Sequence, residues 1–330
     1  MQISKLFAPA IAAAMAFGSV SVASAADTMV LKASDVHPMD YPTVAAVVNM
    51  GEKLEKATNG KYKVEMYPLM QLGGEKEALE QVQIGALAMT RVSVGPVGTM
   101  VDDVNVFNLP FVFRSQDHMR AVIDGDIGAE MLQKITDNPK ANLVGLCWMD
   151  SGTRSVFNKV RPINTPSDLN GLKIRMMGNP IYVETMNALG GNGVAMGMDE
   201  VYNGIATGVV DGAENNPPTY VTHNLHSVAP YYSLTEHLMV PEILVFSKKI
   251  WEKLPADDQA MIKKFAREAQ FDERKLWDEK VKASMDKLVA AGTKINKVED
   301  KAPFQAAVKP VWDKYGAKFS DLLERINAVK

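Results

Sequence analysis

One arginine stands out in this chain because of the residues around it. Arg175 lies in segment 171–177, where apolar and polar or flexible residues alternate. The apolar members of this segment are Leu172, Ile174 and Met176. Alternation at every second position is typical of a half-buried strand, and it places Arg175 on the face opposite the apolar residues. A guanidinium on a rigid strand can bind a carboxylate through two parallel hydrogen bonds, although an ordinary solvated arginine also fits this pattern.

A second arginine and an asparagine could contribute to the same chemistry. Arg154 follows Gly152, which permits a tight bend, and it could either present a second guanidinium to an anion or form a salt bridge between lobes. Asn215 lies in segment 210–218, between an Asp-Gly turn and two prolines. Its amide can both donate to and accept from a hydroxyl or carboxylate. The same composition is also common in ordinary capped loops.

Further polar residues follow the strands predicted in the N-terminal half. His37 and Asp40 come after the first strand, at the edge where open α/β sheets usually bind ligands. Arg91 and Ser93 end another strand of the same half. Glu75 begins a helix whose free amides favour an anion or an acceptor, and it could also simply complement that positive helix end.

Glu242 is a carboxylate inside an apolar segment, residues 240–246. A buried carboxylate needs a partner, and ligand hydroxyls, Arg91 or Arg154 could each provide it. The sequence has no Gly-x-Gly-x-x-Gly, P-loop, Gly-x-Ser-x-Gly or His-Glu-x-x-His motif. Arginines, amides and hydroxyls without a paired base and nucleophile favour binding over turnover. We therefore expect no catalytic residue and no cofactor; the alternative is an extracytoplasmic enzyme acting on acidic sugars, with His37 as its base.

Two lobes are predicted to hold these residues. Strands and helices alternate in the N-terminal half, which favours a parallel or mixed sheet covered by helices. The predicted strands are 28–33, 61–66, 88–94, 142–149, 154–158, 173–176, 208–212 and 241–247, and the predicted helices are 41–58, 76–84, 118–135, 180–189, 199–207, 259–291 and 304–327. Strands 142–149 and 241–247 are predicted to cross between the lobes, and the long helix 259–291 to brace both. Such a molecule closes on its ligand by hinge bending.

Composition and the first residues indicate where the chain works. The chain has 330 residues and a formal net charge of −3, which gives no electrostatic reason to expect nucleic acid or an anionic membrane as a partner. Lys5, the apolar run 6–22 and the Ala-Ser-Ala of 23–25 predict a cleaved signal peptide, residues 1–26. The five histidines have no metal-ligand spacing, so no metal is expected. Cys147 is the only cysteine, which excludes an intramolecular disulfide.

Six segments of the chain, taken together and in order, carry a family resemblance: 67–73, 109–113, 152–154, 168–175, 200–202 and 210–215. Over residues 27–317 the chain resembles the solute-binding proteins of tripartite ATP-independent periplasmic (TRAP) transporters, dicarboxylate-binding-protein-like group. The resemblance implies an α/β, two-lobe periplasmic binding protein fold with mixed sheets, interlobe crossing strands and a long bracing helix. The expected domains are lobe I, 27–149 plus 243–285, and lobe II, 150–242 plus 286–330.

The resemblance also implies a function. Such a protein binds an organic acid in the periplasm and delivers it to membrane permease subunits driven by an ion gradient. Arg175 matches the carboxylate-clamping arginine of the family, Arg154 a second ligand-facing arginine, and Asn215 the asparagine that supports the carboxylate. The full set of expected ligand-binding residues is Arg175, Arg154, Asn215, Glu75, Ser93, Arg91, His37, Asp40, Met177 and Glu242.

Segments 37–42, 91–93 and 211–218 are similar to those of members that bind hexuronates such as glucuronate and galacturonate. In such a site the carboxylates of Glu75 and Glu242 would accept sugar hydroxyls and oppose a second ligand carboxylate. Ser93 stands where close hexuronate binders carry asparagine. A C4-dicarboxylate or another sugar acid is the alternative ligand, and a sensory role at a membrane receptor is an alternative to transport.

Overall fold

The structure is a computed structural model and describes residues 28–330. The predicted signal peptide, residues 1–26, lies outside the described residues. No helix within 28–330 combines the length and the apolar character that crossing a membrane requires.

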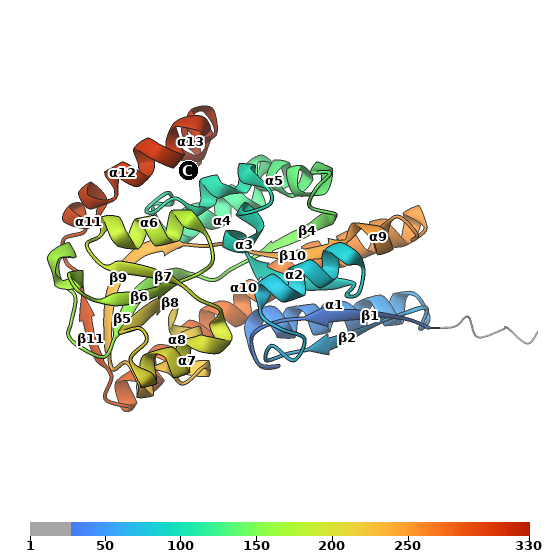
Figure 1. Cartoon of the computed structure of the whole chain (residues 1–330). Helices are drawn as coiled ribbons and strands as arrows, with labels where there is room; N and C mark the ends of the chain where they lie inside the picture. The colour runs from blue at the N-terminus through green and yellow to red at the C-terminus, as the bar shows by residue number, and fades with distance from the viewer. Residues whose placement is uncertain (1–27) are drawn as a thin grey trace, which may run out of the picture.

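A five-stranded mixed sheet forms one half of the molecule (Figure 1). Its order is β2-β1-β3-β10-β4, with β1 (Met29–Ser34), β2 (Tyr62–Tyr67), β3 (Met89–Ser93), β4 (Leu143–Met149) and β10 (Glu242–Ser247). β1 runs parallel to β2 and β3, whereas β10 runs antiparallel to β3 and β4. The helical segments of this half are α1 (Pro42–Ala57), α2 (Glu75–Ile84), α3 (Val94–Gly98), η1 (Asp102–Asn108), α4 (Gln116–Asp124), α5 (Asp126–Asp137) and α9 (Lys248–Trp251).

A six-stranded mixed sheet forms the other half. Its order is β11-β9-β5-β8-β6-β7, with β5 (Thr153–Asn158), β6 (Lys173–Met176), β7 (Asn192–Ala195), β8 (Gly212–Asn215), β9 (Tyr231–Met239) and β11 (Lys294–Lys297). β6 lies between β7 and β8 and is parallel to both. The helical segments here are η2 (Pro166–Leu169), α6 (Pro180–Ala188), α7 (Met198–Thr207), α8 (Pro217–Thr222) and η3 (Leu225–Ser227).

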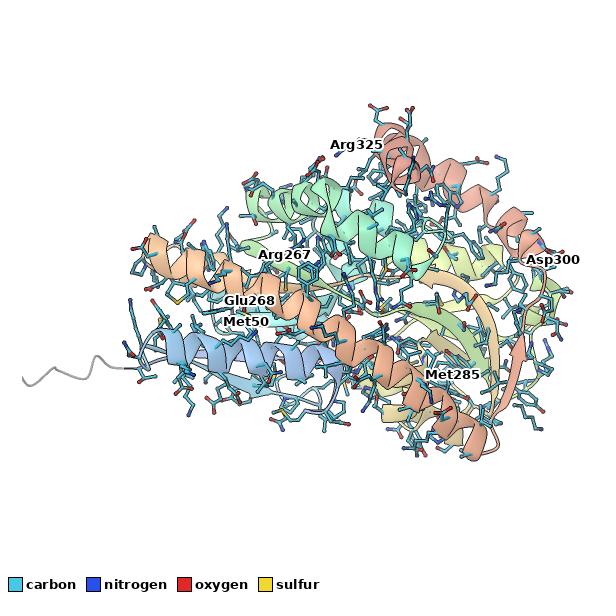
Figure 2. The ribbon with its side chains drawn as sticks, turned by 180° about the vertical axis from the view of Figure 1, so that it is seen from behind. Met50, Arg267, Glu268, Met285, Asp300 and Arg325 are labelled. Carbon is cyan, nitrogen blue, oxygen red and sulfur yellow. The ribbon has the colours of Figure 1, made fainter. Side chains whose placement is uncertain are left out.

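Three segments connect the two halves. Residues 150–152 lead from β4 to β5, and residues 240–241 lead from β9 to β10. The third is the 35-residue helix α10 (Ala256–Ala290), which contacts α1 and β4 on one side and α8 on the other before the chain enters β11. Figure 2, which views the molecule from behind, shows α10 running across both halves, from Glu268 beside α1 to Met285 near the second sheet. The mixed sheets and the long bracing helix confirm the predicted fold class.

The C-terminal segment also packs on both halves. It comprises α11 (Ala302–Ala307), α12 (Lys309–Val311), η4 (Trp312–Gly316), η5 (Ala317–Phe319) and α13 (Ser320–Ala328), and it lies over α4 and α6 in Figure 1. Tyr315 donates to Glu184 of α6 at 2.6 Å, while His118 of α4 bonds to the carbonyl of Ile326 at 2.9 Å. Together with a buried apolar cluster that includes Met131 and Met186, these contacts join the two halves at one end.

Gly152 has a φ of +57° in the first connection. This left-handed conformation is readily available only to glycine. A Cβ atom at this position would lie 3.2 Å from Nε1 of Trp277 in α10. The glycine therefore serves both the backbone turn and the close approach of the connection to the bracing helix.

The structure differs from the predicted elements in several places. Gly125 divides the single helix predicted over 118–135 into α4 and α5, because its extended backbone ends one helix and caps the next. The strand predicted at 208–212 begins only at Gly212. Strands β7, β9 and β11 were not predicted. The crossings themselves are the short connections, whereas 142–149 and most of 241–247 are strands of the first sheet.

Candidate functional site

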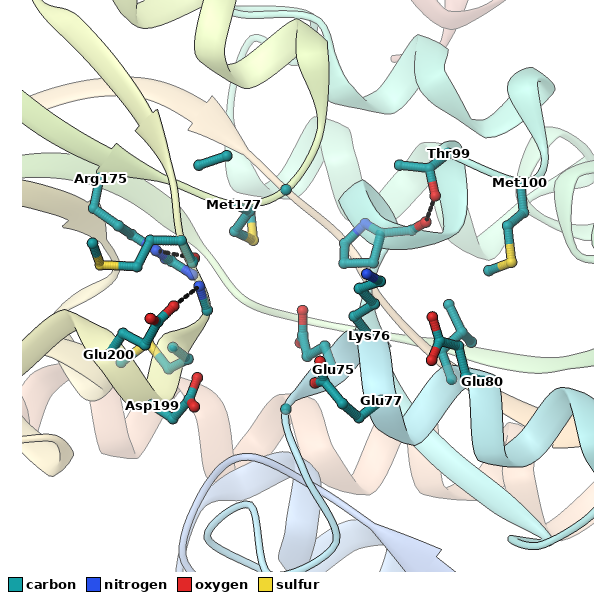
Figure 3. A pocket seen from close by; sticks show the side chains of 18 of the residues that line it. Glu75, Lys76, Glu77, Glu80, Thr99, Met100, Arg175, Met177, Asp199 and Glu200 are labelled. Carbon is teal, nitrogen blue, oxygen red and sulfur yellow. Dashed lines mark hydrogen bonds between the residues drawn. The ribbon is translucent and has the colours of Figure 1, made fainter.

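Two adjoining pockets lie between the halves. The outer pocket has a volume of about 680 Å³ and is lined by α2 and the end of α3 on one side and by β6 and the start of α7 on the other (Figure 3). The inner pocket is small, about 30 Å³, and lies among the ends of the strands. Four residues line both: Glu75, Arg175, Met177 and Met198.

Arg175 is buried without an acidic partner. Its strand, β6, pairs Arg175 with Ala213 of β8 and Val194 of β7, and the side chain is only 4% exposed. Its Nε donates to the carbonyl of Met196 at 2.8 Å, and among residues 28–330 neither Nη atom has a hydrogen-bond partner or an ion pair. Burial lowers the pKa of Arg175 to about 10, so the group stays cationic at neutral pH. A buried, unpaired guanidinium is costly and favours an anion supplied from outside.

Arg154, in contrast, is already neutralised. Its Nε and Nη2 donate to the two carboxylate oxygens of Glu214 at 2.6 and 2.7 Å, and its Nη1 donates to Oδ1 of Asn215 at 2.8 Å. Burial alone would lower the pKa of Arg154, but Glu214 raises it above the ordinary value. Because β5 and β8 are neighbours in one sheet, this ion pair lies within one half of the molecule and is not the interlobe bridge that the sequence left open.

Arg91 holds three carboxylates behind the pocket. It bonds to Asp35, to Glu75 at 2.8 Å and to Glu242 at 2.6 Å, so it is the partner of Glu242 among the alternatives considered. Burial opposes the charge of Arg91, but the carboxylates raise its pKa well above the ordinary value. Arg91 itself lines neither pocket.

Glu75 and Glu242 face the inner pocket and share one hydroxyl. The antiparallel register places Glu242 opposite Ser93. Ser93 Oγ lies 3.0 Å from Oε1 of Glu75 and 3.2 Å from Oε1 of Glu242. A hydroxyl has one hydrogen, so it can donate to only one of them at a time. Burial, reinforced by the charge of Glu75 and opposed by Arg91, raises the pKa of Glu242 to about 7.

Asn215 and Met177 complete the wall on the side of the second sheet. Asn215 uses Oδ1 to accept from Arg154 and from the backbone N–H of Asn216. No hydrogen bond within the described chain uses its NH2 group, which leaves that group available to donate into the inner pocket that Asn215 lines. Met177 directly follows β6 and lines both pockets.

His37 contacts the other half of the molecule directly. Its Nδ1 lies 3.1 Å from Nε2 of His223, at the end of α8, and its ring stacks on Tyr41 with ring centres 3.7 Å apart. Tyr41 in turn bonds to Thr219 of α8 at 2.9 Å. Burial, then the positive charge of Arg91, lowers the pKa of His37 well below its ordinary value, so the imidazole is neutral at neutral pH.

Asp40, like Arg91, lines neither pocket, and unlike Arg91 it forms no ion pair with a residue that does. Its side chain is 72% exposed and accepts from Lys280 of α10 at 2.6 Å. This hydrogen bond is the main cause of its lowered pKa. The turn after Pro38 directs Asp40 toward the bracing helix, whereas His37 lines the inner pocket.

The residues of this arrangement that are absent from the sequence-based set include Asp35, Glu214 and His223, and also Met198, which lines both pockets. Glu214 lies beside Asn215 in segment 210–218, which the sequence singles out, but its pairing with Arg154 depends on the register of β5 and β8. Asp35 and His223 act through pairings across the fold, which no local pattern announces. Within residues 28–330 no group of His, Cys, Asp or Glu side chains is arranged to hold a metal ion.

The fold and the cleft define a class: a two-lobed protein that encloses a small anion between its halves. The family model of the bacterial extracellular solute-binding proteins, family 7 (DctP), matches residues 33–318, and the chain belongs to this family. It is thus a periplasmic solute-binding protein of the TRAP type and not an enzyme.

Solved structures agree with this assignment. A TRAP periplasmic solute-binding protein from Pseudomonas putida F1 with bound D-glucuronate is 53% identical, with 92% of this chain and 98% of that chain covered and a TM-score of 0.90. One from Bradyrhizobium with bound α/β-D-galacturonate is 43% identical, with 90% and 99% covered and a TM-score of 0.87.

A third relative has been solved in two states. The protein from Citrobacter koseri with bound D-glucuronate is 49% identical, covers 92% of this chain and 100% of its own, and has a TM-score of 0.90. Its apo, open structure has a TM-score of 0.80, at 47% identity over 91% and 98% of the two chains. The arrangement of the two halves in this chain is therefore more similar to the ligand-bound state than to the open state.

Proposed function

We propose that this chain captures a hexuronate, glucuronate or galacturonate, and delivers it to the membrane permease subunits of a TRAP transporter. The observation that carries the proposal is the buried guanidinium of Arg175, which no carboxylate neutralises among the described residues. The ligand carboxylate would supply that missing charge through a bidentate pair.

The other residues that line the inner pocket suit a polyol that carries one negative charge. Glu75 and Glu242 present carboxylate oxygens that can accept from ligand hydroxyls, and the NH2 group of Asn215 supplies a donor. One cationic end and several hydroxyl-binding groups match a sugar acid.

A C4-dicarboxylate fits this arrangement less well. Such a ligand needs a second cation, and the other arginine that lines the inner pocket, Arg154, is already paired with Glu214. A second carboxylate would also lie close to Glu75 and Glu242 and be repelled by them. The charge distribution therefore favours one carboxylate over two.

Calorimetry with a small panel of ligands tests the proposal. We expect glucuronate or galacturonate to bind, and glucose and succinate to bind at least about 100-fold more weakly, because each lacks one of the two features the site recognises. Arg175→Ala should weaken uronate binding about 10-fold or more, because the carboxylate loses its charged partner. Arg325→Ala, which removes an exposed arginine of α13, is the matched control. Tighter binding of succinate than of either uronate would contradict the proposal.

A further inference from the structure

The inner pocket, at about 30 Å³, has room for little more than a water molecule, so a bound hexuronate would extend from it into the outer pocket, which is still larger than a free monosaccharide requires. The halves of this chain are arranged as in ligand-bound relatives, yet a pocket of about 680 Å³ remains beside the inner one. The two pockets share Glu75 and Arg175, so they meet at the group expected to bind the ligand carboxylate. Pockets of this volume are typical of sites that enclose drug-sized molecules.

Part of the wall of the outer pocket is apolar and adaptable. Four methionines line it, Met100, Met177, Met196 and Met198, together with Leu79 and Pro96. Methionine side chains are flexible and polarisable, and they accommodate groups of different shape. In Figure 3 Met100 lies across the pocket from Arg175, while Met177 lies between them.

The charged residues around this pocket disfavour a second anion. The acidic residues Glu77 and Glu80 of α2 and Asp199 and Glu200 of α7 line it, and Lys76 is the lysine among its lining residues. A second carboxylate would meet this acidic excess, whereas an uncharged group would not.

The chemistry of a hexuronate connects these observations. On one edge of the sugar ring lie the hydroxyls, which would point to Glu75 and Glu242. On the other edge the carboxylate and the anomeric oxygen flank the ring oxygen. With the carboxylate on Arg175, at the boundary of the two pockets, a group attached to the anomeric oxygen is directed outward. Resting on the proposed function, we propose that the protein also binds hexuronate glycosides, with an uncharged substituent in the outer pocket.

The test compares three kinds of ligand by calorimetry: free glucuronate, its phenyl α- and β-glycosides, and digalacturonate. We expect one phenyl glycoside to bind within about 10-fold of the free acid, since the substituent enters a pocket that already exists. Digalacturonate, with its second carboxylate, should bind at least about 10-fold more weakly than that glycoside.

A pair of variants locates the substituent. Met100→Trp narrows the outer pocket on the side opposite Arg175. It should weaken binding of the phenyl glycoside about 10-fold or more and change the affinity for free glucuronate by less than about 3-fold. Retained glucuronate binding also shows that the variant folds. Met29→Trp, at the exposed start of β1, is the matched control and should change the affinity for neither ligand.

Binding of free glucuronate with more than about 100-fold weaker binding of both phenyl glycosides would overturn this inference and leave the proposed function intact. Equal affinity of Met100→Trp and of the unmodified protein for the glycoside would also overturn this inference. Loss of all uronate binding would instead count against the proposed function itself.

Discussion

Three buried arginines lie at the cleft, and their partners distinguish them. Arg91 bonds to three carboxylates and Arg154 to one, whereas Arg175 has only the carbonyl of Met196. Arg91 and Arg154 thus hold the acidic side chains in place, and Arg175 keeps its charge available. A site prepared for an anion in this way costs stability when the anion is absent.

Replacing Arg175 with methionine should therefore separate binding from stability. Arg175→Met removes a desolvated cation and keeps an apolar side chain, so we expect the unliganded variant to be as stable as the unmodified protein or up to about 3 kcal/mol more stable. Uronate should no longer raise its melting temperature. Urea denaturation with and without glucuronate measures both effects. A variant several kcal/mol less stable than the unmodified protein would contradict this account of Arg175.

The raised pKa of Glu242, about 7, predicts how stability changes with pH. The folded state holds the Glu242 proton more tightly than the unfolded chain, where glutamate titrates near pH 4.3. This contribution to the free energy of unfolding is complete below about pH 4 and is lost as pH rises through about 7, by roughly 4 kcal/mol at most. Glu242→Gln should reduce this decline in stability, which denaturation experiments between pH 4 and 8 measure. Glu80→Gln, at an exposed position of α2, is the control, and an unchanged slope for Glu242→Gln would refute the assignment.

At the scale of the elements, the connection at residues 150–152 can be tested with two glycines. In Gly152→Ala the new Cβ atom is added to a residue with positive φ and lies close to Trp277. In Gly171→Ala the residue also has a positive φ, +78°, but the new Cβ has no atom within 4 Å. Each should lose about 1–2 kcal/mol from backbone strain, and Gly152→Ala about 1–3 kcal/mol more from crowding against the indole. Urea denaturation of both variants gives the difference. Equal losses would show that the contact with Trp277 is unimportant.

The sequence predicts most of the elements because their periodicity is local. Strand β6, helices α1 and α7 and the long helix α10 all have clear apolar spacing, and the structure places them within a few residues of the predicted bounds. Strand β9 was missed because buried polar residues interrupt its apolar pattern, among them Ser233, Thr235 and His237. Short edge strands such as β7 and β11 depend on pairing with a neighbour, which local sequence does not reveal.

Many residues of the inner pocket were predicted from local sequence or from the family resemblance, and the physical signal was clearest where a residue's chemistry conflicts with its surroundings. Arg175 and Glu242 are charged residues in apolar segments, and both lie at the cleft. The pairing of Arg154 with Glu214 depends on the register of β5 and β8, and the contact of His37 with His223 joins positions 186 residues apart. Asp40 is close to His37 in sequence but faces α10. Such distinctions require the tertiary structure.

At the scale of the whole molecule, ligand binding should close the cleft. The similarity of this chain to glucuronate-bound relatives exceeds its similarity to an apo, open one. We therefore expect glucuronate to reduce the radius of gyration of the protein in small-angle X-ray scattering, because the bound ligand favours the closed state. Arg175→Met should show no such change at the same ligand concentration. Identical scattering of the unmodified protein with and without saturating glucuronate would exclude closure on binding.

The most direct test of the role of Arg175 is a thermodynamic cycle measured by calorimetry. Glucuronate and methyl glucuronate ester, which lacks the negative charge, are each titrated into the unmodified protein and into Arg175→Met. We predict that the unmodified protein binds glucuronate about 100-fold more tightly than the ester. In Arg175→Met this preference should fall below about 3-fold, since the ligand carboxylate then has no guanidinium to pair with. An equal preference for the acid in both proteins would show that the carboxylate binds elsewhere.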